Sequence, residues 1–501
     1  MNKNQKKIIF SITLFTITLL ILGIPYTKWG FSLDAFGHVY RCLIKSFHDL
    51  FLFFYEGSTE CIYLPSNSTH TKEFFCGLYR PMSLVFCIPQ GYFFGINPYG
   101  YFLTSITFHA INSVLLFNIF TAITPIFFSF LAAAYFAFHP SLFKWIGHIC
   151  PQQYHIELTI LLLTILLLKK YLDTKKIKFY IISCVLLLSN LFLKEATVIF
   201  ALWSIPATYL YKKINKNNQI SSWKNIKNSI LISIPYWIIT IFYLTIRAII
   251  LPITSNTGTL NFEPNWASFI NRMKERFFDF VSYGSDLLGL TILPQKHQII
   301  KGTLIMIPLL IFLYLFIKNS KKIYIIFLVF SIIIFSWPVI LVQYQPRYIH
   351  MAVAFFIFTV LVLFQFSQRL NLLSKYKKTG TIFLITLIII NSTFLIKTLT
   401  SREKELNHVM TSFQKLIKNK KIKNAVKNKT SLYFFNLPRQ FIVGTAQAMW
   451  LFTKNSSYKV YQYSKSINNI KKFISNIKSN NPKEKFLFIT WDYENKEFMV
   501  L

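Results

Sequence analysis

Residues 178–211 read KFYIISCVLLLSNLFLKEATVIFALWSIPATYLY, and this stretch decides the class of the fold. It consists of two apolar runs, 178–193 and 196–211, joined by the charged pair Lys194-Glu195. Each run is slightly shorter than the roughly 20 apolar residues that cross ~30 Å of hydrocarbon. We therefore expect two membrane helices that tilt little or end below the membrane surface.

Apolar runs of this kind recur along most of the chain. The chain has 501 residues, of which 53% are hydrophobic, and this is too apolar for a soluble protein of its size. The runs long enough to be candidate spans are 8–25, 99–118, 122–138, 154–168, 178–193, 196–211, 229–250, 302–317, 323–341, 349–366 and 379–396. We predict an all-α polytopic membrane protein with about eleven spans, over residues 1–397.

Basic clusters in short loops predict the orientation of these spans. They precede the first span and follow the fourth, sixth, eighth and tenth, at Lys3–Lys7, Lys169–Lys176, Lys212–Lys227, Lys318–Lys322 and Arg369–Lys378. With eleven spans, all five clusters fall on one side, which the positive-inside rule identifies as the cytoplasm. The net charge of +36 therefore indicates topology and anionic headgroups rather than nucleic acid. For the tail, an AT-rich genome is an equally simple source of the lysines.

The opposite side then carries the longer segments, which are residues 26–98, the loop 251–301 and the tail 398–501. We predict that the N-terminus is cytoplasmic and that the tail is a small extracytoplasmic α/β domain. The tail pattern predicts helices at 402–422, 440–453 and 467–478, strands at 431–436 and 458–463, and a final hairpin at 486–500.

Four of the six cysteines, Cys42, Cys61, Cys76 and Cys150, fall on the predicted outer side. Cys61 and Cys76 bracket a polar stretch, so they form either a disulfide or two free thiols. We expect Cys87 and Cys184 to be apolar packing residues.

Ionisable groups cluster at the outer ends of the spans, where they are expensive and therefore functional candidates. The candidates are Asp34, Arg80, His139, Lys194, Glu195, Arg247, Arg347 and Tyr348. One carboxylate beside several cations suits a lipid-phosphate site. Guanidinium groups hold phosphate oxygens bidentately, and a carboxylate accepts the proton of an attacking hydroxyl. The spacing of His, Cys, Asp and Glu gives no metal signal, so no cofactor is predicted and a divalent-metal requirement stays open.

Each candidate also has a purely structural explanation. Arg80 and Arg347 are suited to anchoring helices at the headgroup layer, and Lys194 and Glu195 to pairing with each other. His139 stands where a helix ends, and Asp34 is suited to capping a helix.

Several short motifs, in order, resemble the membrane domain of GT-C glycosyltransferases. The motifs are Tyr79-Arg80-Pro81-Met82-Ser83-Leu84, Gly95-Ile96-Asn97-Pro98-Tyr99-Gly100-Tyr101, His109-Ala110-Ile111-Asn112, Phe138-His139-Pro140, Leu193-Lys194-Glu195 and Arg347-Tyr348. The nearest group is the O-mannosyltransferases that carry tetratricopeptide repeats, with their bacterial relatives. The resemblance covers roughly residues 1–366, and the repeats themselves are absent.

The resemblance implies an inverting transferase that takes a sugar from a polyprenyl-phosphate donor, in the inner membrane of a bacterium. The acidic residue of the family's first outer loop corresponds to Asp34, while Ala35 stands where many relatives have a second acid. The implied partners are the lipid-linked donor, membrane lipids, and a glycan or protein acceptor. A surface-glycan polymerase or ligase and a lipid-linked-sugar flippase are the alternatives. Transporters are often built from internal repeats with sites near the midplane, and neither pattern is present in the sequence.

Overall fold

The computed structural model describes most of the chain outside the segments 27–79, 251–352 and 362–376. The described ranges are 2–26, 80–122, 124–139, 152–215, 222–250, 377–435, 445–454, 460–462, 485–492 and 497–501, with short pieces and single positions between them. The predicted spans 302–317 and 323–341 and most of 349–366 lie outside the described residues.

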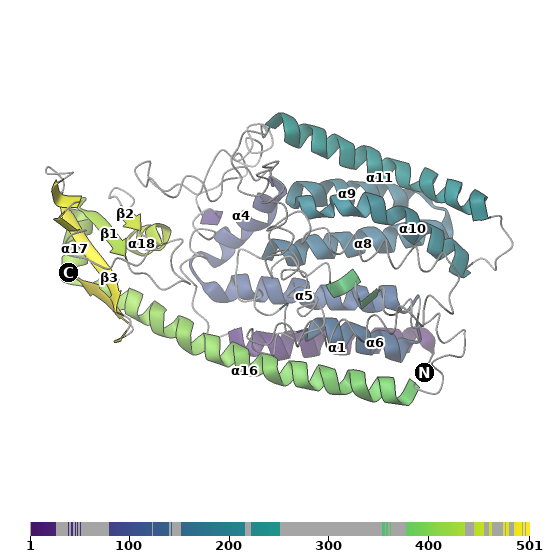
Figure 1. Cartoon of the computed structure of the whole chain (residues 1–501), viewed down its shortest axis with the longest axis horizontal. Coiled ribbons are helices and arrows are strands. Elements are labelled where there is room, and N and C mark those ends of the chain that lie inside the picture. Colours follow the sequence, from purple (N-terminus) through teal and green to yellow (C-terminus); the bar gives the residue numbers. More distant parts are fainter. Residues whose placement is uncertain are drawn as a thin grey trace, which may run out of the picture.

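The described part is mostly helical, with a small sheet at one end (Figure 1). The helices before the sheet are α1 (Lys3–Tyr26), α4 (Met82–Phe94), α5 (Pro98–Phe120), α6 (Ile126–Ala137), α8 (Gln152–Thr174), α9 (Ile177–Leu193), the 3₁₀ turn η1 (Glu195–Val198), α10 (Ile199–Asn215), α11 (Ser222–Ile250) and α16 (Lys377–Lys418). Helices therefore stand where eight of the predicted spans were placed. Helix α4 was not predicted, because its run is short and contains Pro89.

Three described helices are long and apolar enough to cross a membrane. They cover Lys3–Ile24, Pro98–Phe120 and Asn225–Ile250. Helix α11 exposes Ile238 and Ile241, each more than half accessible, while it buries Ser233 and Tyr236. The Tyr236 hydroxyl lies 2.6 Å from Ser183 Oγ of α9. Apolar groups outside and polar groups inside are the reverse of a soluble helix, and this pattern is typical of a helix that spans a membrane.

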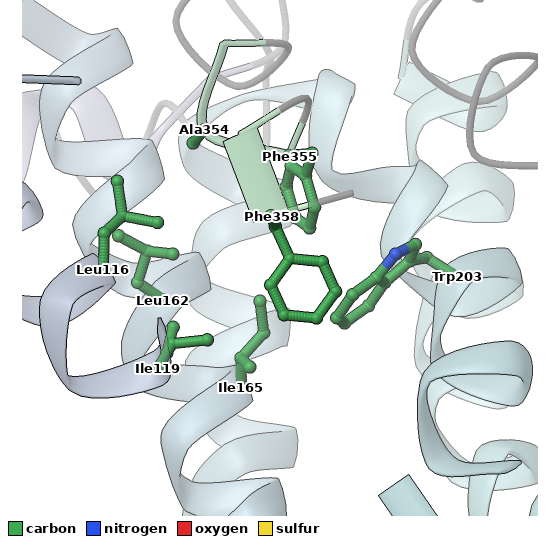
Figure 2. A pocket seen from close by; sticks show the side chains of 8 residues that line it. All are labelled: Leu116, Ile119, Leu162, Ile165, Trp203, Ala354, Phe355 and Phe358. Carbon is green, nitrogen blue, oxygen red and sulfur yellow. The ribbon is translucent and has the colours of Figure 1, made fainter. Parts of the chain in front are cut away.

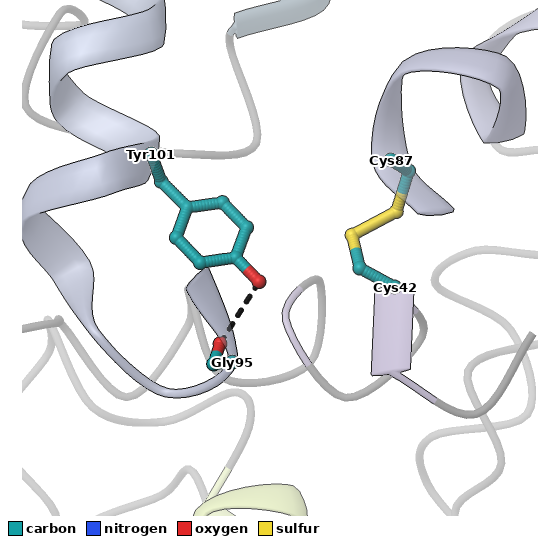
Figure 3. The surroundings of a disulfide bond; sticks show 4 residues. All are labelled: Cys42, Cys87, Gly95 and Tyr101. Carbon is teal, nitrogen blue, oxygen red and sulfur yellow. Dashed lines mark hydrogen bonds between the residues drawn. A yellow bond between two sulfur atoms is a disulfide. The ribbon is translucent and has the colours of Figure 1, made fainter. Parts of the chain in front are cut away.

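A disulfide joins Cys42 to Cys87 of α4 (Figure 3), so the expectation that Cys87 is only a packing residue was wrong. The backbone comes close at the same place. A Cβ on Gly91, one turn further along α4, would lie 2.3 Å from the carbonyl oxygen of Cys42. Only glycine fits there without moving backbone. Cys61, Cys76 and Cys150 lie outside the described residues.

The chain passes from α4 to α5 through a short turn. The side chain of Asn97 accepts a hydrogen bond from the Tyr99 amide and caps α5, and Pro98 occupies its first position. The buried Tyr101 donates its hydroxyl hydrogen to the carbonyl of Gly95, at 3.0 Å (Figure 3). These bonds fix where α4 ends and α5 begins.

Helix α16 connects the helical bundle to the sheet. It starts at the end of the bundle where the N-terminus lies and runs the length of the bundle to the sheet (Figure 1). The predicted span 379–396 and the predicted helix 402–422 are thus parts of one 42-residue helix, which ends at Lys418. This helix passes without a break through the predicted boundary at Lys397.

The tail is a four-stranded sheet with the order β2-β1-β3-β4. Its elements are α17 (Lys420–Lys427), β1 (Ser431–Phe435), α18 (Thr445–Thr453), β2 (Val460–Gln462), β3 (Phe486–Asp492) and β4 (Glu497–Val500). β1 is parallel to β2 and β3, and β4 is antiparallel to β3, which confirms the predicted strands and hairpin. Most of the predicted helix 467–478 lies outside the described residues. The described residues there are helical, and they are Ile474, Ser475 and 477–479.

The end of α16 packs on this sheet. The Phe413 ring lies 5.6 Å from that of Phe498 in β4, and the Ser412 hydroxyl accepts a hydrogen bond from the Phe498 amide at 2.9 Å. The last turns of α16 therefore belong to the core of the tail, and the tail is held on the bundle by a helix.

Candidate functional site

Five of the predicted site residues lie in the described part of the chain. These are Arg80, His139, Lys194, Glu195 and Arg247. The other three, Asp34, Arg347 and Tyr348, lie outside the described residues.

Arg80 and Glu195 form a bidentate ion pair, although 115 positions separate them in the sequence. Arg80 Nε donates to Glu195 Oε2 at 2.8 Å, and Arg80 Nη2 donates to Glu195 Oε1. The two side chains are 17% and 33% exposed. The pair joins the residue just before α4 to the turn η1.

Lys194 pairs with Glu157, a residue that sequence reasoning missed. Lys194 Nζ lies 3.6 Å from Glu157 Oε2, and the two side chains are only 2% and 1% exposed. Thr197 donates its hydroxyl hydrogen to Glu157 Oε1 at 3.1 Å, and the Lys194 ammonium stands over the ring of Tyr154. Glu157 is the only acid in the predicted span 154–168, which is the signal that could have found it.

The backbone at the end of α9 explains why adjacent residues have different partners. Lys194 is extended, with φ −163° and ψ 131°, between the last turn of α9 and η1. Successive side chains of an extended segment point to opposite sides. Glu195 pairs with Arg80 and Lys194 lies beside Glu157, so the structural alternative in which Lys194 and Glu195 pair with each other is not what the structure shows. Asn190 supports the arrangement by donating from Nδ2 to the carbonyl of Glu157 at 3.0 Å.

These four side chains, Arg80, Glu157, Lys194 and Glu195, are called the buried charge cluster below. Burial alone would raise the pKa of Glu195, but the Arg80 guanidinium outweighs this effect and lowers the pKa to about 2. Glu195 is therefore ionised at neutral pH. Each cation of the cluster lies beside a carboxylate, and such pairing is how buried ionisable groups are tolerated inside a protein.

Arg247 belongs to helix α11, and this helix passes close to the cluster at Tyr243. Tyr243, one turn earlier on α11, is fully buried, interacts electrostatically with Arg80, and packs edge-on against Phe192 of α9. Arg247 Nε is buried and has no hydrogen-bond partner among the described residues. Arg247 is thus a further cation near the end of α11, one turn beyond Tyr243.

His139 lies on a different helix from the cluster. It is fully buried after the end of α6, and Tyr135 packs edge-on against its ring. Next to it, His109 Nε2 lies 3.0 Å from the carbonyl oxygen of Ala137.

A second polar group links α5 to α8, and it includes His109 and Asn112 of a motif that resembles the GT-C family. The His109 ring lies 5.4 Å from the ring of His155. Asn112 of α5 donates from Nδ2 to the His155 carbonyl at 2.9 Å and accepts from Thr159 Oγ1 at 2.7 Å. These bonds hold α5 against the turn of α8 that carries Glu157, so they position the cluster.

A small apolar hollow, with a cavity volume of about 10 Å³, lies between α5, α8, α10 and the piece 353–358 (Figure 2). Its lining residues are Leu116, Ile119, Leu162, Ile165, Trp203, Ala354, Phe355 and Phe358. This volume is far below the roughly 300–1,000 Å³ of a small-molecule site, and among the lining side chains only the Trp203 indole could contact a sugar. The buried charge cluster, and not this hollow, is therefore the candidate site for binding a sugar or a phosphate.

The described residues contain no group of three or more His, Cys, Asp or Glu side chains that could hold a metal ion. No known protein family and no curated protein matches the sequence. The geometry of the chain itself is thus the ground for a functional proposal.

Proposed function

We propose that this protein is an inverting membrane glycosyltransferase of the GT-C type. It would transfer a sugar from a polyprenyl-phosphate donor to an acceptor on the extracytoplasmic side. The observation that carries the proposal is the buried charge cluster, in which Arg80 and Lys194 are held inside a bundle of lipid-exposed helices by Glu195 and Glu157. Both cations belong to the motifs that resemble the GT-C family.

The depth of the cluster suits a lipid-linked phosphate. Helix α9 has 17 residues and ends just before Lys194. At ~1.5 Å per residue this is roughly 25 Å, which is less than the ~30 Å of hydrocarbon. In the proposed orientation, a helix of this length brings Lys194 and Glu195 to the outer boundary of the hydrocarbon, where the phosphate of a polyprenyl lipid meets its apolar chain.

The charge balance assigns separate roles to the basic residues. Glu195 holds Arg80 in place and Glu157 holds Lys194, so the two cations are preorganised donors. The additional positive charge that a phosphate requires comes from Arg247, whose Nε has no partner among the described residues, and from Arg347. His139 and Tyr348 are kept as further candidates, because they belong to the motifs that resemble the GT-C family.

The reaction follows from these roles. The oxygen of an acceptor hydroxyl attacks the anomeric carbon and inverts it, and the bond between this carbon and the phosphate oxygen breaks. The electron pair leaves with the polyprenyl phosphate, whose charge the cations stabilise. The hydroxyl proton passes to the carboxylate of Asp34. The disulfide fixes Cys42, eight positions after Asp34 in the sequence, against the helix that follows Arg80.

The test is sugar transfer by the purified chain in proteoliposomes that contain polyprenyl-phosphate hexoses. We expect Asp34→Asn to abolish transfer, because the amide is a poor proton acceptor, while the thermal unfolding midpoint is unchanged. The matched control is Asp173→Asn, which alters an exposed carboxylate paired with Lys169 at the other end of α8. Transfer at the wild-type rate by Asp34→Asn, or movement of the donor across the bilayer without transfer, would refute the proposal.

A further inference from the structure

The tail carries a dense basic surface that the proposed transfer site does not use. Residues 415–429 contain seven lysines and no acid. All seven are exposed, and they are Lys415, Lys418, Lys420, Lys421, Lys423, Lys427 and Lys429. These residues are called the α17 lysine surface below.

The fold holds these lysines outward. Ile422, Ala425 and Val426 are buried and attach α17 to the tail. At 100° per residue, Lys420, Lys423 and Lys427 fall on the opposite side of the helix, in one row. The start of the helix is fixed by the Asn419 side chain, which accepts a hydrogen bond from the Lys421 amide at 2.9 Å. The cap and the buried residues thus fix the backbone that carries the lysine row.

The length of α16 keeps this surface away from the membrane. The apolar part of α16 ends near Lys397, and the 22 residues from there to Lys418 are about 33 Å long. A headgroup layer takes up only about 5–8 Å of this length. The remaining distance exceeds two Debye lengths of ~8–10 Å, so the charge of the membrane in which the protein sits is largely screened at α17.

We propose that the α17 lysine surface binds an anionic polysaccharide outside the membrane. This inference rests on the proposed function only for the side of the membrane and for the expectation of a glycan there. Repeated carboxylates or phosphates along a flexible chain match a row of point charges on flexible stems. The polysaccharide would be the acceptor or the growing product, held outside the membrane by the tail.

The composition of the surface argues against other anionic partners. Residues 415–429 contain no aromatic residue, so there is no platform on which the bases of a single-stranded nucleic acid could stack. The segment also has no arginine, and Trp, Tyr and Arg are the residues that dominate protein–protein hot spots. Hydrated lysines without apolar anchors favour a diffuse, charge-driven contact with a hydrophilic polymer.

The experiment is direct binding of the full chain, in nanodiscs of neutral lipid, to polygalacturonate, with dextran of matched length as the uncharged comparison. We expect binding to polygalacturonate that weakens as salt is raised, and no binding to dextran. The triple variant Lys420→Gln, Lys423→Gln and Lys427→Gln should weaken this binding at least tenfold. A triple variant at the other end of the bundle, Lys170→Gln, Lys176→Gln and Lys178→Gln, removes the same charge from exposed positions and should change it less than twofold.

Equal losses in the two variants would mean that net charge alone acts, and they would overturn the proposal, as would no binding of the wild-type chain. Tighter α17-dependent binding to anionic phospholipid vesicles or to single-stranded DNA would also overturn it and assign the surface to that partner. Transfer of sugar to a short, uncharged acceptor separates the two proposals. The α17 triple variant should retain this transfer. Asp34→Asn should lose it, whether or not the lysine surface binds a polysaccharide.

Discussion

The buried charge cluster and the α17 lysine surface use the same kinds of side chain in opposite surroundings. In the cluster, Lys194 and Glu157 are almost completely buried, and each cation has a carboxylate partner. On the α17 lysine surface, seven exposed lysines stand without an acid in the segment 415–429. A charge inside a helical bundle is stable only with a partner, while a charge in water needs none. Removing a charge should therefore lower the free energy of unfolding in the buried charge cluster, whereas on the α17 lysine surface it should weaken only ligand binding.

The largest effect is expected from breaking the more buried pair. Lys194→Met leaves Glu157 without its counter-ion and should lower the free energy of unfolding by about 3–5 kcal/mol. The double variant Lys194→Met and Glu157→Met removes both charges and should recover most of this loss. Thermal and denaturant unfolding in micelles measures both. A double variant as unstable as the single one would show that the loss is not due to an unpaired charge.

The pH dependence of the less buried pair sharpens the comparison. The pKa of Glu195 is about 2 in the folded protein, against 4.5 for the free side chain, so between these values the folded state binds fewer protons. The contribution of this carboxylate to stability should be complete above about pH 4.5 and fall as pH falls toward 2. The measurement is the difference in unfolding free energy between the wild type and Glu195→Gln at each pH. A difference that stays constant down to pH 2 would contradict the assigned ion pair.

The smallest effect is expected within the lysine surface itself. Lys429 has φ 53°, a left-handed conformation that favours glycine, because it follows the Asn428 cap of α17. The amide of Thr430 donates to the carbonyl of Ala425 at 2.8 Å, which is the bond that ends a helix in this motif. Lys429→Gly should stabilise the tail by roughly 0.5–1 kcal/mol. Destabilisation in the same unfolding assay would mean that the lysine side chain contributes to folding.

The sequence predicted the helices well because their cause is local. An apolar run in the hydrocarbon satisfies its backbone only as a helix, so 8–25, 99–118 and 229–250 coincide with α1, α5 and α11. The final hairpin was also predictable, since Asp492 accepts hydrogen bonds from the amides of Glu494 and Asn495 in the expected turn.

The partners in the site were not predictable from one sequence. Arg80 and Glu195 are 115 positions apart, and Cys42 and Cys87 are 45 apart, so only the packing of the helices decides these pairs. Glu157 was visible as a lone acid in an apolar run, but the sequence did not indicate that Lys194 would turn toward it. The continuity of α16 was missed because its hydropathy changes near Lys397, although its backbone does not.

The most direct test of the account is a structure of the full chain with polyprenyl phosphate, determined by electron cryomicroscopy. The account predicts phosphate density at the η1 end of α9, within contact distance of Arg247 and beside Arg80 and Lys194, with the apolar chain between helices. Phosphate density at the opposite end, near Lys169 and Lys170, would contradict it.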